Sequence, residues 1–328
     1  MERTGLEQNP ELQEEEIFND EQKAMEPINF EASKQDILKL FYEDEPIQAY
    51  NLFKKLKQCI EQDLVQFNDD QSETPEQQMD KFEQSEEMVA LKKDFLIIEY
   101  FMKELNSDMS SWTRHTDKPD FKIYYRQEQG FKGLTLYLEV EFKSPLMNLF
   151  TILAEVDLFQ KWIPFTAKSE LKGSVSHLRK LAYLKQNFPF PMSAREVYLS
   201  ACGIALEDQK ACILTLSSVE KDSWFGTSIQ RDPKCVYMDI HKAFIYAKAL
   251  DKNTSVLKMI QNVDPHLDYI PQALINFGMK NLIGVFIGQI RKRCENLPEE
   301  YLKLMEEKKE FYDEIYRKVC AVSQESVL

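Results

Sequence analysis

The feature that most constrains the fold is a change of hydrophobic period near residue 110. Before it, apolar residues recur at the helical spacing of about 3.6 residues. After it, apolar and polar residues alternate in runs separated by turn signals such as Gly173-Ser174 and Glu207-Asp208, which is typical of β-strands. Strands that follow one another through short turns pair antiparallel. The sequence therefore predicts an α+β protein built on one antiparallel sheet.

The alternating part predicts a series of strands interrupted by one helix. Strands are expected near Trp112 and over 121–125, 134–142, 167–172, 176–186, 193–206, 210–219, 235–249 and 254–263. Pro145 opens a helix that ends near Trp162, and Pro271 opens a long apolar helix that reaches about Arg293. A sheet with one solvated face needs a cover for the other face. We expect the helix after Pro271 to lie across the sheet.

The N-terminal third carries the acidity of the chain. Residues 1–100 hold 26 Asp and Glu against 10 Lys and Arg, a net charge of −16, whereas the whole chain has −14. We interpret 1–33 as a disordered acidic tail, 34–67 as a helical hairpin and 68–85 as a linker. Phosphates would be repelled here, so the composition argues against nucleic acid as a partner.

The remaining motifs exclude several classes of protein. The N-terminus has no apolar signal segment, and the six cysteines are scattered without a CxxC pair, which favours a cytoplasmic protein with reduced thiols. The sequence has no Walker loop, dinucleotide fingerprint or zinc-protease motif. We therefore expect no metal and no cofactor.

Residues 149–292 resemble one known family, the START (steroidogenic-acute-regulatory-related lipid transfer) domains. The matching motifs are Leu153-Ala154-Glu155-Val156-Asp157 with Trp162, Phe188-Pro189-Phe190-Pro191 with Arg195-Glu196, and Val263-Asp264-Pro265 with Tyr269-Ile270-Pro271. Their order and spacing agree over about 180 residues once the helix at 88–105 is taken as the family's first helix. The resemblance places the START-like domain at 86–293 and leaves 294–328 as a C-terminal helical extension.

The resemblance implies a helix-grip fold, in which a curved antiparallel sheet wraps around a long C-terminal helix, and a tunnel for one lipid between them. It implies a non-enzymatic protein that binds and transfers a lipid of the phospholipid or sterol class through transient peripheral contact with membranes. It also implies the ligand-binding side chains, which we assign to Arg195, Tyr183, Trp162, Leu274, Phe277, Asn281 and Phe286.

Arg195 departs from the family pattern in its surroundings. In some START domains this arginine has an acidic partner on the preceding strand, whereas the segment 177–186 contains no acid. A buried arginine without a partner is costly, so an anionic head group, Glu196 or Tyr183 is expected to meet it. A structural salt bridge is the alternative.

Two further segments have alternative interpretations. Trp224 and Phe225 lie where the family has the loop beside the tunnel mouth, which suggests a gate or a membrane contact; packing on the rim of the sheet is the alternative. Residues 269–290 carry one charge, Lys280, and a membrane-spanning helix is the alternative to the lid helix.

Two other functions remain open. In the first, the protein is a scaffold with a vestigial cavity that binds a partner protein through its N- or C-terminal helices. In the second, it is a helix-grip enzyme that acts on an apolar substrate. The enzyme hypothesis requires polar groups that converge in the cavity, for example Arg195 with Tyr183 and His241.

Overall fold

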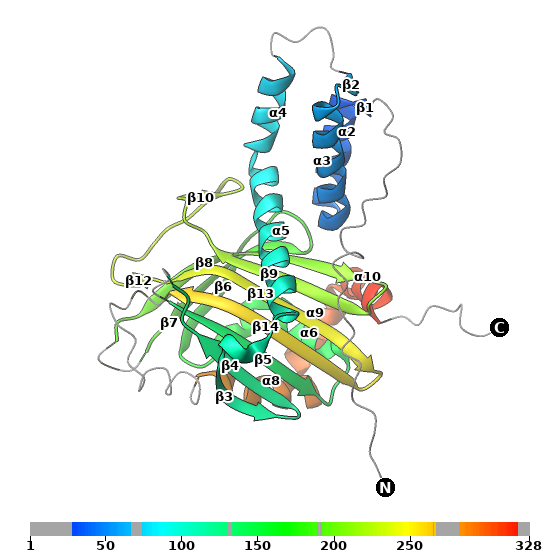
Figure 1. Ribbon diagram of the computed structural model, residues 1–328. Coiled ribbons are helices and arrows are strands. Elements are labelled where there is room, and N and C mark those ends of the chain that lie inside the picture. The colour runs from blue at the N-terminus through cyan, green and yellow to red at the C-terminus, as the bar shows by residue number, and fades with distance from the viewer. Residues whose placement is uncertain are drawn as a thin grey trace, which may run out of the picture. The chain divides into compact units, whose positions relative to one another are not determined.

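The computed structural model describes residues 28–66, 74–129, 133–188, 190, 192–264, 266 and 282–320 of the 328-residue chain. The chain divides into two compact units, Met1–Met109 and Ser110–Leu328. Helices dominate the first unit and a large sheet dominates the second (Figure 1). The helix that we assigned to the START-like domain from residue 86 lies in the first unit.

The first unit is a group of helices that pack through aromatic side chains. Its elements are β1 (Ile28–Asn29), α2 (Phe30–Tyr42), α3 (Pro46–Glu61), β2 (Val65–Gln66), α4 (Pro75–Glu83) and α5 (Glu86–Leu105). The ring of Tyr50 in α3 stacks on Phe95 in α5 with centroids 4.0 Å apart. The short strands β1 and β2 pair in parallel. The predicted helical hairpin corresponds to α2 and α3.

Two boundaries predicted in this unit are wrong. Helix α2 begins at Phe30, inside the predicted tail, because the Asn29 side chain accepts a hydrogen bond from the Ala32 N–H and caps the helix. Residues 75–83 form α4 rather than part of a linker. There, Thr74 Oγ1 accepts from the Gln77 N–H and Gln77 Oε1 accepts from the Thr74 N–H, which is a capping box.

A large antiparallel sheet forms the body of the second unit. Its strands are β3 (Thr113–Lys118), β4 (Phe121–Arg126), β5 (Leu134–Phe142), β6 (Thr166–Ser174), β7 (Arg179–Gln186), β8 (Arg195–Leu206), β9 (Ala211–Ser218), β13 (Asp239–Asp251) and β14 (Thr254–Asp264). Their order across the sheet is β3-β4-β5-β14-β13-β9-β8-β7-β6, with every neighbouring pair antiparallel. The predicted fold class, α+β with an antiparallel sheet, is confirmed.

The predicted run 235–249 is divided between two strands. β12 (Val236–Tyr237) leaves the main path and pairs in parallel with the start of β8, with Val236 opposite Arg195. β13 then starts at Asp239. A separate two-stranded hairpin, β10 (Ser223–Trp224) and β11 (Thr227–Ser228), precedes β12.

Helices cover one face of this sheet. They are α6 (Leu146–Ala154), the 3₁₀ helix η2 (Val156–Lys161), α8 (Gly284–Glu295), α9 (Glu299–Glu307) and α10 (Lys309–Val319). In Figure 1, α6, α8 and α9 lie behind the sheet and α10 lies beside β8. Their buried side chains join those of β5, β13 and β14 in one hydrophobic core. The start of the predicted lid helix, at Pro271, lies outside the described residues.

The part of the predicted C-terminal helical extension, 294–328, that follows Pro298 contains two helices, α9 and α10. It breaks at Lys308, and a buried carboxylate holds the break in place. Glu155, directly after α6, accepts hydrogen bonds from Lys308 Nζ at 2.6 and 2.8 Å and from the Tyr312 hydroxyl at 2.6 Å. These hydrogen bonds to a single carboxylate hold Lys308 and Tyr312 beside Glu155. They connect the start of α10 to the end of α6 at the point where the chain turns.

Candidate functional site

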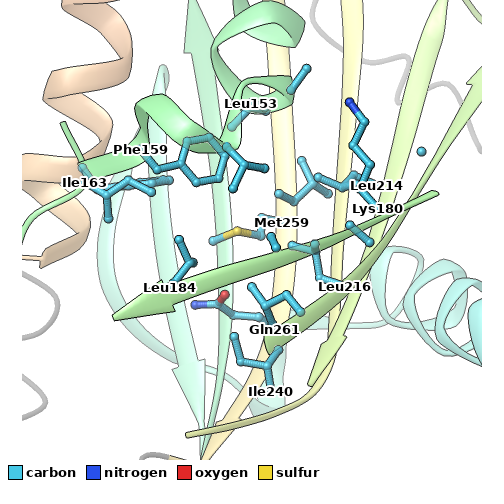
Figure 2. A pocket seen from close by; sticks show the side chains of 18 of the residues that line it. Leu153, Phe159, Ile163, Lys180, Leu184, Leu214, Leu216, Ile240, Met259 and Gln261 are labelled. Carbon is cyan, nitrogen blue, oxygen red and sulfur yellow. The ribbon is translucent and has the colours of Figure 1, made fainter. Parts of the chain in front are cut away.

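The second unit encloses a cavity of about 490 Å³ between the sheet and its helices. Side chains alternate along a strand, so each strand lines the cavity with the side chains of one face. In the β7 region the side chains that point into the cavity are those of Leu178, Lys180, Ala182, Leu184 and Gln186. Figure 2 shows Leu153, Phe159 and Ile163 from the helical side opposite Leu214, Leu216 and Met259 from the sheet. This volume is in the range of small-molecule sites.

The cavity wall is almost entirely apolar. Leucine, isoleucine, valine, phenylalanine and methionine side chains make up most of it. The charged and strongly polar side chains among its described lining residues are His177, Lys180, Gln186, Arg195 and Gln261, and no aspartate or glutamate is among them. In the view of Figure 2, Gln261 lies toward the end near Ile240, and Lys180 toward the opposite end. The described interior therefore carries positive charge only.

Arg195 is the most deeply buried of these charged side chains, with an exposed fraction of 5%. It begins β8, opposite Gln186 of β7, and its Nη1 donates to the Ser193 carbonyl oxygen at 2.6 Å. Within the described parts of the chain, no carboxylate lies within salt-bridge distance of its guanidinium. Burial lowers the pKa of Arg195 from its ordinary value, because a low-dielectric site disfavours the charged form. The structural salt bridge that was the alternative role of Arg195 is absent from these residues.

Trp162 and Phe286 also line the cavity, as predicted side chains of the site. Trp162 follows η2, and Phe286 lies in the first turns of α8. Their ring centroids are 5.4 Å apart. The crossover helix and the described part of the lid helix therefore meet at the cavity wall. The other predicted lid residues, Leu274, Phe277 and Asn281, lie outside the described residues.

Tyr183 does not line the cavity, although we assigned it to the site. It lies on the outer face of β7 in a small cluster with Tyr198 and Trp224, and its hydroxyl donates to Glu196 at 2.9 Å. Burial and this hydrogen bond raise the pKa of Tyr183. Glu196 also points to that face, where it accepts from the Asp232 N–H. Both groups are thus separated from Arg195 by the sheet.

The polar groups required by the enzyme hypothesis do not converge. Arg195 lies on the inner face of the sheet and Tyr183 on the outer face, while His241 is exposed and is not a lining residue. No group of three or more His, Cys, Asp or Glu residues suited to holding a metal ion occurs in the described part of the chain.

The segment with Trp224 and Phe225 forms a tight hairpin on the outer face. Phe225 (φ 43°) and Gly226 (φ 75°) are both in the left-handed region that a two-residue turn of this kind requires. Trp224 is buried in the cluster with Tyr183, and its Nε1 donates to Ser200 Oγ at 3.0 Å. Neither aromatic lines the cavity. The geometry corresponds to the alternative in which Trp224 packs on the rim of the sheet.

Sequence reasoning missed several lining residues. Three of them are Lys180, Gln186 and Gln261, which lie an even number of positions from the apolar lining residues Ala182, Leu184 and Met259 on the same strands. This two-residue spacing, which puts side chains on the same face of a strand, was the signal that could have found them. Sequence reasoning also missed α10, whose side chains Phe311, Ile315 and Val319 line the cavity.

None of the helices that the structure describes is both long and apolar enough to span a bilayer.

Comparisons with known proteins identify the fold. No family model matches the chain, and no curated protein matches it. Among solved structures, human STARD10 is similar with a TM-score of 0.54 and 14% identity, over 64% of this chain and 82% of that one. Human StAR-related lipid transfer protein 5 is similar with a TM-score of 0.54 and 15% identity, over 63% of this chain and 97% of that one. The chain has the START helix-grip fold, which confirms the resemblance seen in the sequence at the level of fold.

Proposed function

We propose that the second unit binds one lipid molecule in its cavity and transfers it between membranes in the cytoplasm without covalent chemistry. The hydrocarbon part of the lipid would occupy the apolar wall and its anionic head group would pair with Arg195. The observation that carries this proposal is the buried arginine in an apolar cavity, without a carboxylate partner among the described residues.

The apolar wall supports a lipid as ligand. Each methylene group moved from water into such a cavity contributes about 0.8 kcal/mol. A hydrocarbon chain therefore gains binding free energy along the whole cavity without any polar contact. One of the two similar human proteins is a StAR-related lipid transfer protein, which agrees with this class of ligand.

The guanidinium of Arg195 supports an anionic head group in particular. Arginine presents a planar fork of donors that matches phosphate or carboxylate oxygens in two parallel hydrogen bonds. A buried cation without a counter-charge is unfavourable, so an anionic ligand would stabilise the site as it binds. An uncharged sterol would leave this cation unpaired. We therefore propose a phospholipid, or another lipid with an anionic head group, as the ligand.

The cavity also bears on the scaffold hypothesis. A scaffold with a vestigial cavity is expected to fill that space with side chains at the packing density of a protein interior. A volume of about 490 Å³ is left between the sheet and the helices instead. We favour the carrier for this reason.

Native mass spectrometry tests the proposal directly. The full chain, incubated with liposomes that contain phosphatidylcholine, phosphatidylserine and cholesterol, is expected to carry one phospholipid per protein. Protein that stays empty in all mixtures would contradict lipid binding and would favour the scaffold. Loading with cholesterol alone would overturn the assignment of Arg195 to a head group.

Replacing Arg195 by glutamine is expected to lower phospholipid loading about tenfold to a hundredfold, because a hydrogen bond to a charged group contributes about 1.5–3 kcal/mol. The measurement is the ratio of loaded to empty protein in the same spectra. Arg114, which is exposed on β3, provides the matched control: Arg114→Gln is expected to load like the unmodified chain. Equal loading of Arg195→Gln would remove this residue from the site.

Transfer requires a contact with the membrane, and we propose Phe190 as the side chain that makes it. Phe190 is 97% exposed, and the nearby Phe188 and Met192 both line the cavity. An exposed aromatic ring beside the cavity suits insertion into a bilayer interface. We therefore propose a membrane contact between β7 and β8 rather than at Trp224 and Phe225.

Phe190→Asp is expected to slow transfer of a fluorescent phosphatidylcholine between liposomes about tenfold, because a carboxylate is repelled from the apolar interface. The amount of lipid bound should stay unchanged, since Phe190 itself is not a lining residue. Leu250, also exposed and apolar, is the control position, and Leu250→Asp should transfer normally. If both variants transfer at the normal rate, Phe190 makes no membrane contact.

A further inference from the structure

Helix α10 supplies one wall of the cavity. Phe311, Ile315 and Val319 are spaced four residues apart, so they share one face of the helix, and all three line the cavity. The opposite face is solvated, as Tyr316 with an exposed fraction of 54% shows. The helix therefore turns its apolar face to the cavity rather than to another protein.

Strand β8 carries small residues on its inner face at the end of the cavity that α10 covers. Along the inner face of β8, Arg195, Val197 and Leu199 are followed by the small residues Ala201, Gly203 and Ala205. Helix α10 packs against β8, and the side chains of Leu178, Ala205 and Phe311 all pack against the same hydrophobic core. The side chain of Leu178 lies over Gly203, 3.3 Å from the position that a Cβ would take there, so Leu178 and α10 together limit the space above the small residues of β8.

The two ends of the cavity lie far apart along β8. Arg195 pairs with Gln186 of β7, and Ala201 pairs with Lys180. Six residues of extended strand span roughly 20 Å. A lipid whose head group meets Arg195 would thus direct its hydrocarbon chain along β8 toward Ala201 and α10.

Several contacts fix α10 in this place. Its first turn is tied to Glu155 through Lys308 and the Tyr312 hydroxyl. Lys180 Nζ lies 5.5 Å from the centre of the Phe311 ring, and the His177 ring packs edge-on against it at 5.9 Å. Contacts with Glu155 after α6 and with His177 and Lys180 in the β7 region therefore fix the position of α10 along the cavity.

We propose that α10 is the end wall of the cavity and that Ile315 and Val319 determine how long a hydrocarbon chain the protein accepts. This inference rests on the proposed binding of a lipid with its head group at Arg195. Each additional methylene that finds room in the cavity raises affinity about fourfold. A change in the position of the wall therefore changes the preferred chain length, while the class of head group stays the same.

The test is a competition among saturated phosphatidylserines whose acyl chains run from lauroyl to arachidoyl, read by native mass spectrometry on the full chain. Ile315→Ala enlarges the cavity and is expected to raise the ratio of the longest to the shortest bound lipid at least tenfold. Val319→Phe fills the same end and is expected to lower that ratio by a similar factor. Tyr316→Ala, on the solvated face of the same helix, should leave the ratio unchanged.

The outcomes separate this inference from the proposed function. If the unmodified chain takes up none of these lipids, the proposed function fails. If it takes them up but all three variants keep its chain-length profile, α10 is not the end wall. Opposite shifts from the enlarging and the filling variant support the inference, since general loosening of the fold by either substitution would shift both profiles in the same direction.

Discussion

Replacement of Ala201 by tryptophan is expected to reduce lipid loading at least tenfold while the protein remains folded. Ala201 lies on the inner face of β8, near the end of the cavity that α10 closes. An indole ring at this position would occupy the space that a hydrocarbon chain needs. Because the ring enters an existing cavity, the cost in stability should stay near the lower end of the 1–3 kcal/mol that overpacking causes.

Loading is measured by native mass spectrometry and folding by circular dichroism during thermal unfolding. Leu171→Trp, at an exposed position of β6, adds the same side chain outside the cavity and should load normally. An Ala201→Trp variant that is folded and fully loaded would show that lipid binds elsewhere. This result would also remove the basis for the inference about α10.

The largest effect on stability is expected from Leu138→Ala. Leu138 is 1% exposed in the core where β5 meets the covering helices. Truncation removes buried apolar surface and leaves a cavity, so the free energy of unfolding should fall by about 2–5 kcal/mol. The same substitution at Leu250, which is 52% exposed on β13, should change it by less than about 0.5 kcal/mol.

Urea unfolding followed by tryptophan fluorescence is suited to this comparison. The three tryptophans, Trp112, Trp162 and Trp224, all lie in the second unit, so their emission reports on that unit alone. Equal midpoints for Leu138→Ala and Leu250→Ala would contradict the core described here. A second transition seen only by circular dichroism would belong to the helical first unit.

The strands were predictable because period-two alternation is a local property of the sequence. The run predicted over 210–219 is β9 at Ala211–Ser218, and that over 193–206 is β8 at Arg195–Leu206. The assignment of Arg195, Trp162 and Phe286 to the ligand site rested on the family resemblance. The resemblance carries information on three-dimensional structure that the alternation of apolar and polar residues does not contain.

The face of each strand was harder to predict. Tyr183 was assigned to the cavity, but β7 is apolar on both faces: Leu181 and Tyr183 point outward, and Ala182 and Leu184 point inward. A strand that is apolar on both sides gives no signal for the face that meets the ligand. Arg195 and Glu196, adjacent in sequence, were likewise considered as partners although they point to opposite faces.

The errors in helices have a different origin. In α4, the polar composition of 68–85 outweighed the capping box at Thr74 and Gln77, which is a local signal present in the sequence. The break at Lys308 has no such signal, because it depends on Glu155, more than 150 residues earlier. Interactions of that range are set by tertiary structure and do not appear in a local pattern.

The position of α10 has a consequence for the order of events during synthesis. All strands of the sheet are complete once Asp264 has left the ribosome, whereas the helix that closes the far end of the cavity begins at Lys309. Domains fold as units, N-terminal domain first during synthesis, and the sheet and α10 belong to the same unit. Until Lys309 and the residues after it have emerged, the inner face of β8 at Ala201 and Gly203 has no α10 to cover it. A hydrophobic molecule taken up at that stage would be enclosed when the last helix docks.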